Sequence, residues 1–159
     1  LEASFLVFLL QPHHKNFNKR IVKQPKLYFF DSGLLCALLD IQSPQQLDSH
    51  YLRGNVFENL IISEYIKSSL HAGRRPNVFF WRNSTGHEID LMIEADARLW
   101  AVEIKSGETL NEDFFKNLRY FKRISSAPDE CFYLVYGGDR NFPRKHGQVI
   151  GWKSISKLP

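Results

Sequence analysis

Cysteines are scarce in this sequence and phosphate-binding glycine loops are missing, and each shortage excludes a class of protein. Only two cysteines occur, Cys36 and Cys131, far apart and without a Cys-x-x-Cys pair, which argues against a disulfide framework or a zinc site. No Gly-x-x-x-x-Gly-Lys-Ser/Thr or Gly-x-Gly-x-x-Gly loop is present, so the sequence lacks a motif for hydrolysing ATP. We expect both cysteines to be reduced, buried thiols.

Apolar runs long enough to span a bilayer are also missing. The apolar segment at residues 3–10 is too short, and it lacks the basic leader and cleavage site of a signal peptide. We therefore expect a cytoplasmic protein that does not act at a membrane. The sequence begins without methionine and inside this apolar segment, which suggests a fragment of something longer.

The composition is typical of a folded globular domain. Of the 159 residues, 43% are hydrophobic, 24% charged and 14% aromatic. The formal net charge of +4 suits an anionic partner such as nucleic acid, although many basic proteins bind none. This length accommodates one ordinary domain, which we predict over residues 50–159. An N-terminal appendage over residues 1–49 is interpreted as the remnant of a preceding domain.

Hydrophobic periodicity and turn residues predict a mixed α/β domain. A strand at residues 26–30 is followed by Asp31, which we interpret as a helix N-cap rather than a catalytic acid, and a polar stretch lies at residues 13–20. Beyond residue 50 the predicted order is α-β-β-β-α-β. Its elements are a helix over 50–71 closed by Gly73, strands over 78–82, 88–94 and 99–105, a helix over 110–124 and a strand over 131–138. A last short strand over 149–152 follows this order.

Charged residues interrupt two of these predicted strands. The short polar segment at residues 95–98 predicts a hairpin, so strands 88–94 and 99–105 should be antiparallel neighbours. Alternation gives each strand one apolar and one charged face, which places Asp90, Glu103 and Lys105 on the same side. Two close carboxylates repel unless a cation such as Mg²⁺ or Mn²⁺ compensates. The alternative is a solvated sheet face carrying ordinary surface ion pairs.

Glu58 stands out on the predicted helix over residues 50–71. It lies near the middle of a broad apolar arc, so its carboxylate should point to the protein interior. An ionised group buried there needs a cation, a metal-linked network or hydrogen-bond donors. The alternative to a functional role is an ion pair with an arginine of the N-terminal segment.

Together, these residues resemble a known superfamily. An acid on a leading helix (Glu58 in GNVFENLI), an Asp on a strand (Asp90 in GHEIDLMIE) and Glu-x-Lys on the next strand (Glu103 and Lys105 in AVEIKSG) resemble the PD-(D/E)XK nucleases, although Ile89 replaces the motif's proline. The element order resembles their restriction-endonuclease-like core. The segments PKLYFFDSGL, RGNVFENLIISE, FFWRNSTGHEIDLMIE and AVEIKSGE resemble the C-terminal domain of unknown function of prokaryotic AAA-type ATPases.

This resemblance implies a metal-dependent nuclease site. Asp90 and Glu103 would ligate Mg²⁺ or Mn²⁺, Lys105 would position the attacking water or stabilise developing charge, and Glu58 would be an outer or second-metal ligand. DNA would be the substrate, and an ATPase domain would precede this one. The alternative is a catalytically inactive module of the same fold that binds nucleic acid or protein and regulates the attached ATPase.

Basic residues near the predicted site are candidates for contacts with nucleic acid. Arg82 ends the first predicted strand, and four others lie on the helix at residues 110–124. A basic run of this kind is also typical of the solvated side of an amphipathic helix, and both interpretations remain open. The candidates are Arg82, Lys116, Arg119, Lys122 and Arg123.

Overall fold

A six-stranded mixed sheet forms the centre of the molecule. In the computed structural model, which describes residues 1–13 and 24–159, the strand order is β3-β4-β5-β6-β8-β7. Strands β3, β4 and β5 are antiparallel neighbours, β5, β6 and β8 run parallel, and β7 pairs antiparallel with β8. The strands are β3 (Val78–Arg82), β4 (Glu88–Ala95), β5 (Arg98–Lys105), β6 (Phe132–Tyr136), β7 (Phe142–Arg144) and β8 (Gly147–Gly151).

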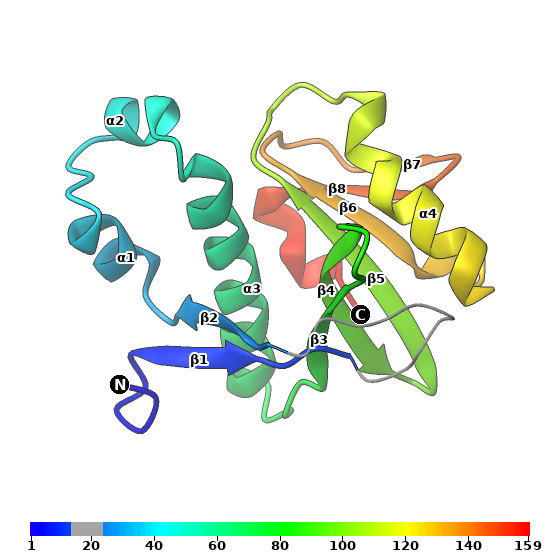
Figure 1. Ribbon diagram of the computed structural model, residues 1–159, viewed down its shortest axis with the longest axis horizontal. Coiled ribbons are helices and arrows are strands. Elements are labelled where there is room, and N and C mark those ends of the chain that lie inside the picture. Colours follow the sequence, from blue (N-terminus) through cyan, green and yellow to red (C-terminus); the bar gives the residue numbers. More distant parts are fainter. Residues whose placement is uncertain (14–23) are drawn as a thin grey trace.

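Helices cover both faces of this sheet. Helix α3 (Arg53–His71) and the C-terminal 3₁₀ segment (Trp152–Lys157) pack on one face, and α4 (Lys116–Ser125) packs on the other (Figure 1). Met92 and Ala101, predicted on a charged face, are buried in the layer under α4. The prediction of one apolar and one charged face per strand is therefore wrong, because α4 shields the second face from water.

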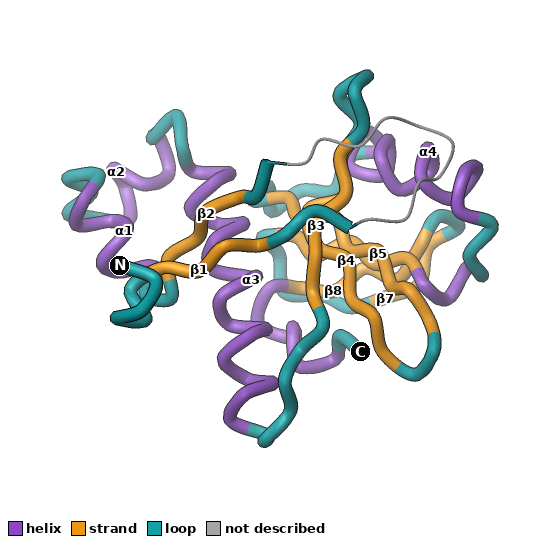
Figure 2. The backbone as a smooth tube through the Cα atoms, turned by 60° about the horizontal axis from the view of Figure 1, so that its bottom comes forward, coloured by secondary structure: helices purple, strands orange, loops and turns teal. Residues whose placement is uncertain are grey.

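The N-terminal part forms a small layer beside α3. Strands β1 (Val7–Leu10) and β2 (Lys26–Phe29) pair antiparallel, and α1 (Ser32–Leu38) and α2 (Pro44–Ser49) lead to α3 (Figure 2). The Asn59 side chain on α3 accepts from the Phe29 amide at 2.7 Å and donates to the Phe29 carbonyl at 3.1 Å. Since this clamp uses backbone groups, it holds β2 against α3 at a defined position.

A second connection ties the N-terminal part to the sheet. The register of β3 with β4 shifts between Phe79 and Trp81, which leaves the backbone of Phe80 free to pair elsewhere. Its amide donates to the Gln11 carbonyl at 3.1 Å, and its carbonyl accepts from the His13 amide at 2.7 Å. The N-terminal layer therefore packs on both α3 and the edge of the sheet.

Most predicted elements are found, with some differences at their ends. Asp31 caps α1 as predicted, its carboxylate accepting from the Leu34 amide. The hairpin turn is confirmed, since Asp96 and Ala97 both have positive φ, as a two-residue type I′ turn requires. Helix α2 was not predicted, although Ser43 caps it and Pro44 starts it. Strand β7 was also missed, and the helix expected from residue 110 begins as a 3₁₀ turn, Glu112–Phe115.

Other expectations have mixed outcomes. Both cysteines are free thiols, but only Cys131 is buried, and the prediction of burial is wrong for the half-buried Cys36. Of the polar stretch predicted at residues 13–20, only His13 belongs to the described part of the chain. In that part, every helix is too short or too polar to traverse a bilayer.

Gly137 joins the ends of β5 and β6 by a close backbone approach. Its amide donates to the carbonyls of Lys105 and Gly107, both at 3.1 Å, and an added Cβ would lie 2.4 Å from the carbonyl oxygen of Ser106. Gly137→Ala is therefore expected to displace the chain that follows Lys105 and to cost about 1–3 kcal/mol of unfolding free energy, measured in urea. The matched change Gly54→Ala, where nothing lies within 4 Å, should be neutral or slightly stabilising. Equal effects of the two changes would contradict this expectation.

Candidate functional site

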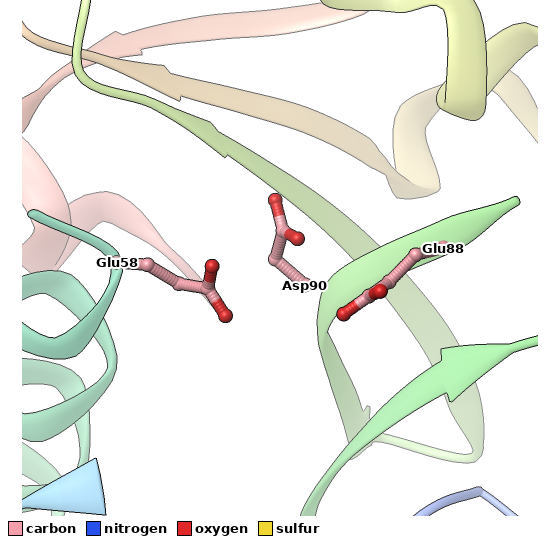
Figure 3. A group of neighbouring side chains, drawn as sticks. All are labelled: Glu58, Glu88 and Asp90. Carbon is pink, nitrogen blue, oxygen red and sulfur yellow. The ribbon is translucent and has the colours of Figure 1, made fainter. Parts of the chain in front are cut away.

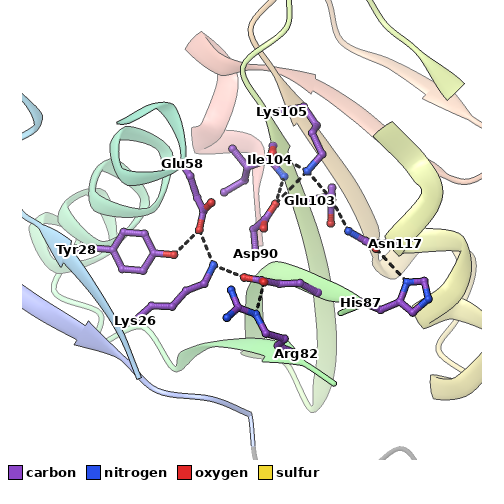
Figure 4. A network of polar contacts seen from close by, with 11 residues as sticks. Lys26, Tyr28, Glu58, Arg82, His87, Asp90, Glu103, Ile104, Lys105 and Asn117 are labelled. Carbon is purple, nitrogen blue, oxygen red and sulfur yellow. Dashed lines mark hydrogen bonds and ion pairs between the residues drawn. The ribbon is translucent and has the colours of Figure 1, made fainter. Parts of the chain in front are cut away.

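The site forms where β4 and β5 separate. Their ladder is regular from Ala95 to Leu91, which pairs with Val102, and stops there. At the next position the Asp90 carboxylate accepts the backbone amide of Ile104 at 2.8 Å (Figure 4). A side chain thus replaces a strand–strand hydrogen bond, which holds Asp90 at 7% exposure in the opening between the two strands.

Asp90, Glu103 and Lys105 converge in this opening. The Lys105 ammonium lies 2.6 Å from Glu103 Oε1 and 3.7 Å from Asp90 Oδ2. Glu103 is only 1% exposed, and Oε1 also accepts a hydrogen bond from Asn117 Nδ2 at 3.0 Å. Its second oxygen, Oε2, is buried and has no hydrogen-bond partner among the residues that the structure describes. The three charged side chains expected on one side therefore meet, in a protein interior and not on a solvated face.

Glu58 reaches the same opening from α3. Its Oε1 accepts from Lys26 Nζ at 2.8 Å and from the Tyr28 hydroxyl, and both of these residues belong to β2. Lys26 also pairs with Glu88. The need for a cation near Glu58 was predicted correctly, and the N-terminal segment supplies a lysine where the sequence suggested an arginine.

Three carboxylates form a group that can hold a metal ion. Oxygens of Glu58, Glu88 and Asp90 all lie within 4.8 Å of one another (Figure 3). Glu103, predicted as a metal ligand, is not in this group, and Asp90 lies between Glu58 and Glu103 (Figure 4). Glu88 was missed as a candidate. Its position two residues before Asp90 on the same strand was the available signal.

Burial and charge shift the pKa values of the central groups. Burial, followed by the negative charges of Glu103 and Glu58, raises the pKa of Asp90 well above its usual range. Burial also raises the pKa of Glu103, against the opposing effect of Lys105. For Lys105, burial favours the neutral amine, but the nearby acids outweigh it and raise the pKa of the ammonium. Two carboxylates that resist ionisation are a feature of sites completed by a cation.

The carboxylate oxygens of these acids fit a hard divalent cation. All the convergent acids offer carboxylate oxygens, which Mg²⁺ and Mn²⁺ prefer, and the buried Oε2 of Glu103 can bind a cation or accept a hydrogen bond from a water. His87 does not enter the group of acids. Its ring stacks on Tyr120 at 3.7 Å between centroids, and its Nδ1 lies 3.3 Å from Asn117 Oδ1.

A family model described as a domain of unknown function, DUF4143, matches residues 53–155. The chain belongs to this family. Residues 1–45 match a separate model, also described as a domain of unknown function, DUF8612. Uncharacterized proteins of Mycobacterium tuberculosis and Mycobacterium bovis are 28% identical over 144 residues, which is 90% of this chain and 31% of each relative. No solved structure matches the chain.

The two family matches divide the site between them. The DUF4143 part contains all four acids and Lys105, whereas Lys26 and Tyr28 lie in the segment that matches the other model. Lys26 therefore neutralises part of the negative charge of these acids from outside the region that matches DUF4143.

The five basic candidates are distributed around the DUF4143 domain. Arg82 pairs with Glu88 at the site, with 39% of its side chain exposed. On α4, Lys122 Nζ lies 2.6 Å from Asp129, and Arg119 lies 3.4 Å from Glu112. The exposed members are Lys116 and Arg123.

Proposed function

We propose that this DUF4143 domain is a metal-dependent phosphodiesterase acting on DNA, of the PD-(D/E)XK type and with a restriction-endonuclease-like core. The observation that carries the proposal is the meeting of Asp90, Glu103 and Lys105 at the open ends of β4 and β5. Glu-x-Lys on one strand and an Asp on its neighbour supply carboxylates to hold a metal ion and an ammonium to stabilise developing negative charge, which suits metal-assisted phosphodiester hydrolysis.

The proposed metal ligands centre on Asp90. Its carboxylate can share a cation with Glu58 and Glu88 on one side, and Glu103 is the next acid on the other. A bound Mg²⁺ or Mn²⁺ would polarise the scissile phosphate and lower the pKa of a coordinated water. Because the Ile104 amide holds one oxygen of Asp90, this carboxylate is oriented before any cation arrives.

Lys105 and the basic surface have separate roles in this proposal. The Lys105 side chain is one-third exposed, and its ammonium, which lies beside both acids, is placed to donate to the attacking water or to a phosphate oxygen. Asn117 holds Glu103 in position from α4. Arg82 and the α4 residues Lys116, Arg119, Lys122 and Arg123 would contact the DNA backbone, which makes binding dependent on salt concentration.

An attached ATPase is part of the same proposal. The segments RGNVFENLIISE and AVEIKSGE resemble the C-terminal domain of prokaryotic AAA-type ATPases. The curated relatives are consistent with an additional domain, since this chain spans only 31% of their length.

One observation favours a second candidate, a non-catalytic module that uses this fold for nucleic-acid or protein contacts. Lys26 and Arg82 already pair with Glu58 and Glu88, so the acids have cationic partners without a metal. In that case the cluster is a structural ion-pair network, and divalent cations should show no saturable binding.

Incubation with DNA separates the two candidates. We expect the 159-residue chain to cleave plasmid or single-stranded DNA in the presence of Mg²⁺ or Mn²⁺ and to lose this activity in EDTA, as followed by gel electrophoresis. Calorimetry should show saturable Mn²⁺ binding that Glu103→Ala weakens. Absence of cleavage with every divalent cation tried, together with absence of specific binding, would favour the non-catalytic module.

A further inference from the structure

Lys26 occupies an unusual position for a residue of the N-terminal segment. Its ammonium lies 2.8 Å from Glu58 Oε1 and also pairs with Glu88 Oε1, so it contacts two of the three acids that can surround a cation (Figure 4). Only 19% of its side chain is exposed. The ring of Phe80 supports the ammonium from 5.4 Å. Lys26 therefore places a positive charge directly beside acids that can surround a cation.

The backbone of β2 places the lysine there. Asn59 clamps Phe29 to α3, and Tyr28 donates to the same oxygen of Glu58 that Lys26 contacts. On the opposite strand, Leu10 pairs in register with Lys26. Because these contacts fix the strand on both sides of Tyr28, the flexible side chain of Lys26 can move while the backbone of the N-terminal layer stays in place.

An ammonium and a divalent cation compete for the same oxygens. A divalent cation among Glu58, Glu88 and Asp90 would take ligands from two carboxylates that Lys26 now contacts, those of Glu58 and Glu88, and two cations so close would repel strongly. Among the residues that the structure describes, the four acids of the site pair with three basic side chains, Lys26, Arg82 and Lys105. This near-balance leaves little net attraction for a further cation while Lys26 stays in place.

We propose that the Lys26 ammonium is the resident counter-ion of Glu58 and Glu88, and that a divalent cation binds the group that these two acids form with Asp90 by displacing Lys26. The inference rests on the proposed function, since it concerns the metal site of that reaction. The N-terminal segment, which matches a separate family model, thereby sets the metal affinity of the DUF4143 domain. Loss of a residue from a metal site normally weakens metal binding. Here we expect removal of the positive charge of Lys26 to strengthen it.

The test is Mn²⁺ binding to the metal-free protein, measured by calorimetry without DNA. Lys26→Met keeps the length and apolar stem of the side chain, and we expect it to bind Mn²⁺ at least about tenfold more tightly than the wild type. Lys26→Arg retains the charge and should bind within about threefold of the wild type. The matched control Lys67→Met removes a lysine that pairs with Glu64 on α3, outside the site, and should leave the affinity unchanged.

A second measurement covers the case in which Lys26→Met does not fold. In the wild type, ¹⁵N NMR should detect the hydrogen-bonded Lys26 ammonium, assigned by its absence from the Lys26→Arg spectrum, and saturating Mg²⁺ should remove this signal. A folded Lys26→Met variant with unchanged or weaker Mn²⁺ affinity overturns the inference, as does a Lys26 signal that persists in Mg²⁺. Tighter metal binding without DNA cleavage by any variant would instead support the inference and reject the nuclease function.

Discussion

Asp90→Asn is expected to reduce metal-dependent DNA cleavage by at least about 10²–10³-fold. Asp90 and Glu58 belong both to the predicted ligand set and to the group of three carboxylates, and of the two Asp90 also lies beside Lys105. The amide keeps the shape of the side chain and can still accept from Ile104, so the change removes a charged metal ligand and little else. Initial rates on plasmid DNA at saturating Mg²⁺ or Mn²⁺ provide the measurement.

The stability of the Asp90→Asn variant and a control substitution on the same strand distinguish loss of a metal ligand from loss of folding. Burial and neighbouring acids raise the pKa of Asp90, so ionising it in the folded metal-free protein is unfavourable, and stability from this group falls as the pH rises through that raised pKa. Asp90→Asn removes this cost and should leave the metal-free protein at least as stable as the wild type at pH 8. Glu94→Gln changes an exposed acid of the same strand outside the site and should retain the wild-type rate. Similar rates for Asp90→Asn and the wild type would contradict the nuclease proposal.

Phe121→Ala is expected to lower the free energy of unfolding by about 3–5 kcal/mol. Phe121 is 1% exposed in the layer between α4 and the sheet, where its ring packs edge-on against Trp81 at 5.0 Å between centroids. Since domains of this size unfold at about 5–15 kcal/mol, the loss is a large share of the total. Urea unfolding followed by circular dichroism measures it.

The same substitution at an exposed phenylalanine serves as the control. Phe5 is 78% exposed, and Phe5→Ala should change the unfolding free energy by less than about 0.5 kcal/mol. The Phe121 variant should also lose activity at temperatures where it remains folded, because α4 carries the Asn117 that holds Glu103. A loss below about 1 kcal/mol would show that α4 is not a firmly packed part of this domain.

The site is built from segments that are far apart in the sequence. The separation of β4 from β5 exposes a backbone amide for Asp90, while α3 and β2 bring Glu58 and Lys26 from the opposite side. Acids that repel one another are held together because an ammonium lies near each of them. In the proposed function this arrangement orients the acids for a metal ion, and in the described structure lysine ammonium groups neutralise part of their charge.

The polar turn at residues 95–98 predicted the central hairpin, and alternation along its strands predicted that three of its charged residues converge. Alternation over residues 88–94 and 99–105 put Asp90, Glu103 and Lys105 on one side, and the structure brings them together. The apolar arc around Glu58 also predicted a buried acid in need of a cation. These features depend on local geometry, since side chains alternate along a strand and recur every turn along a helix.

Tertiary structure alone decided which partners these residues meet. Lys26 and Tyr28 reach Glu58 across more than 25 residues of sequence, and Asn117 reaches Glu103 only because α4 covers the second face of the sheet. That coverage also turned a predicted solvated face into a buried one. The sequence determined the strands, the hairpin and the acids on them, because short-range sterics and alternation govern these. The packing of distant segments determined the counter-ions and the burial, because charge pairing depends on distances in space that no local pattern encodes.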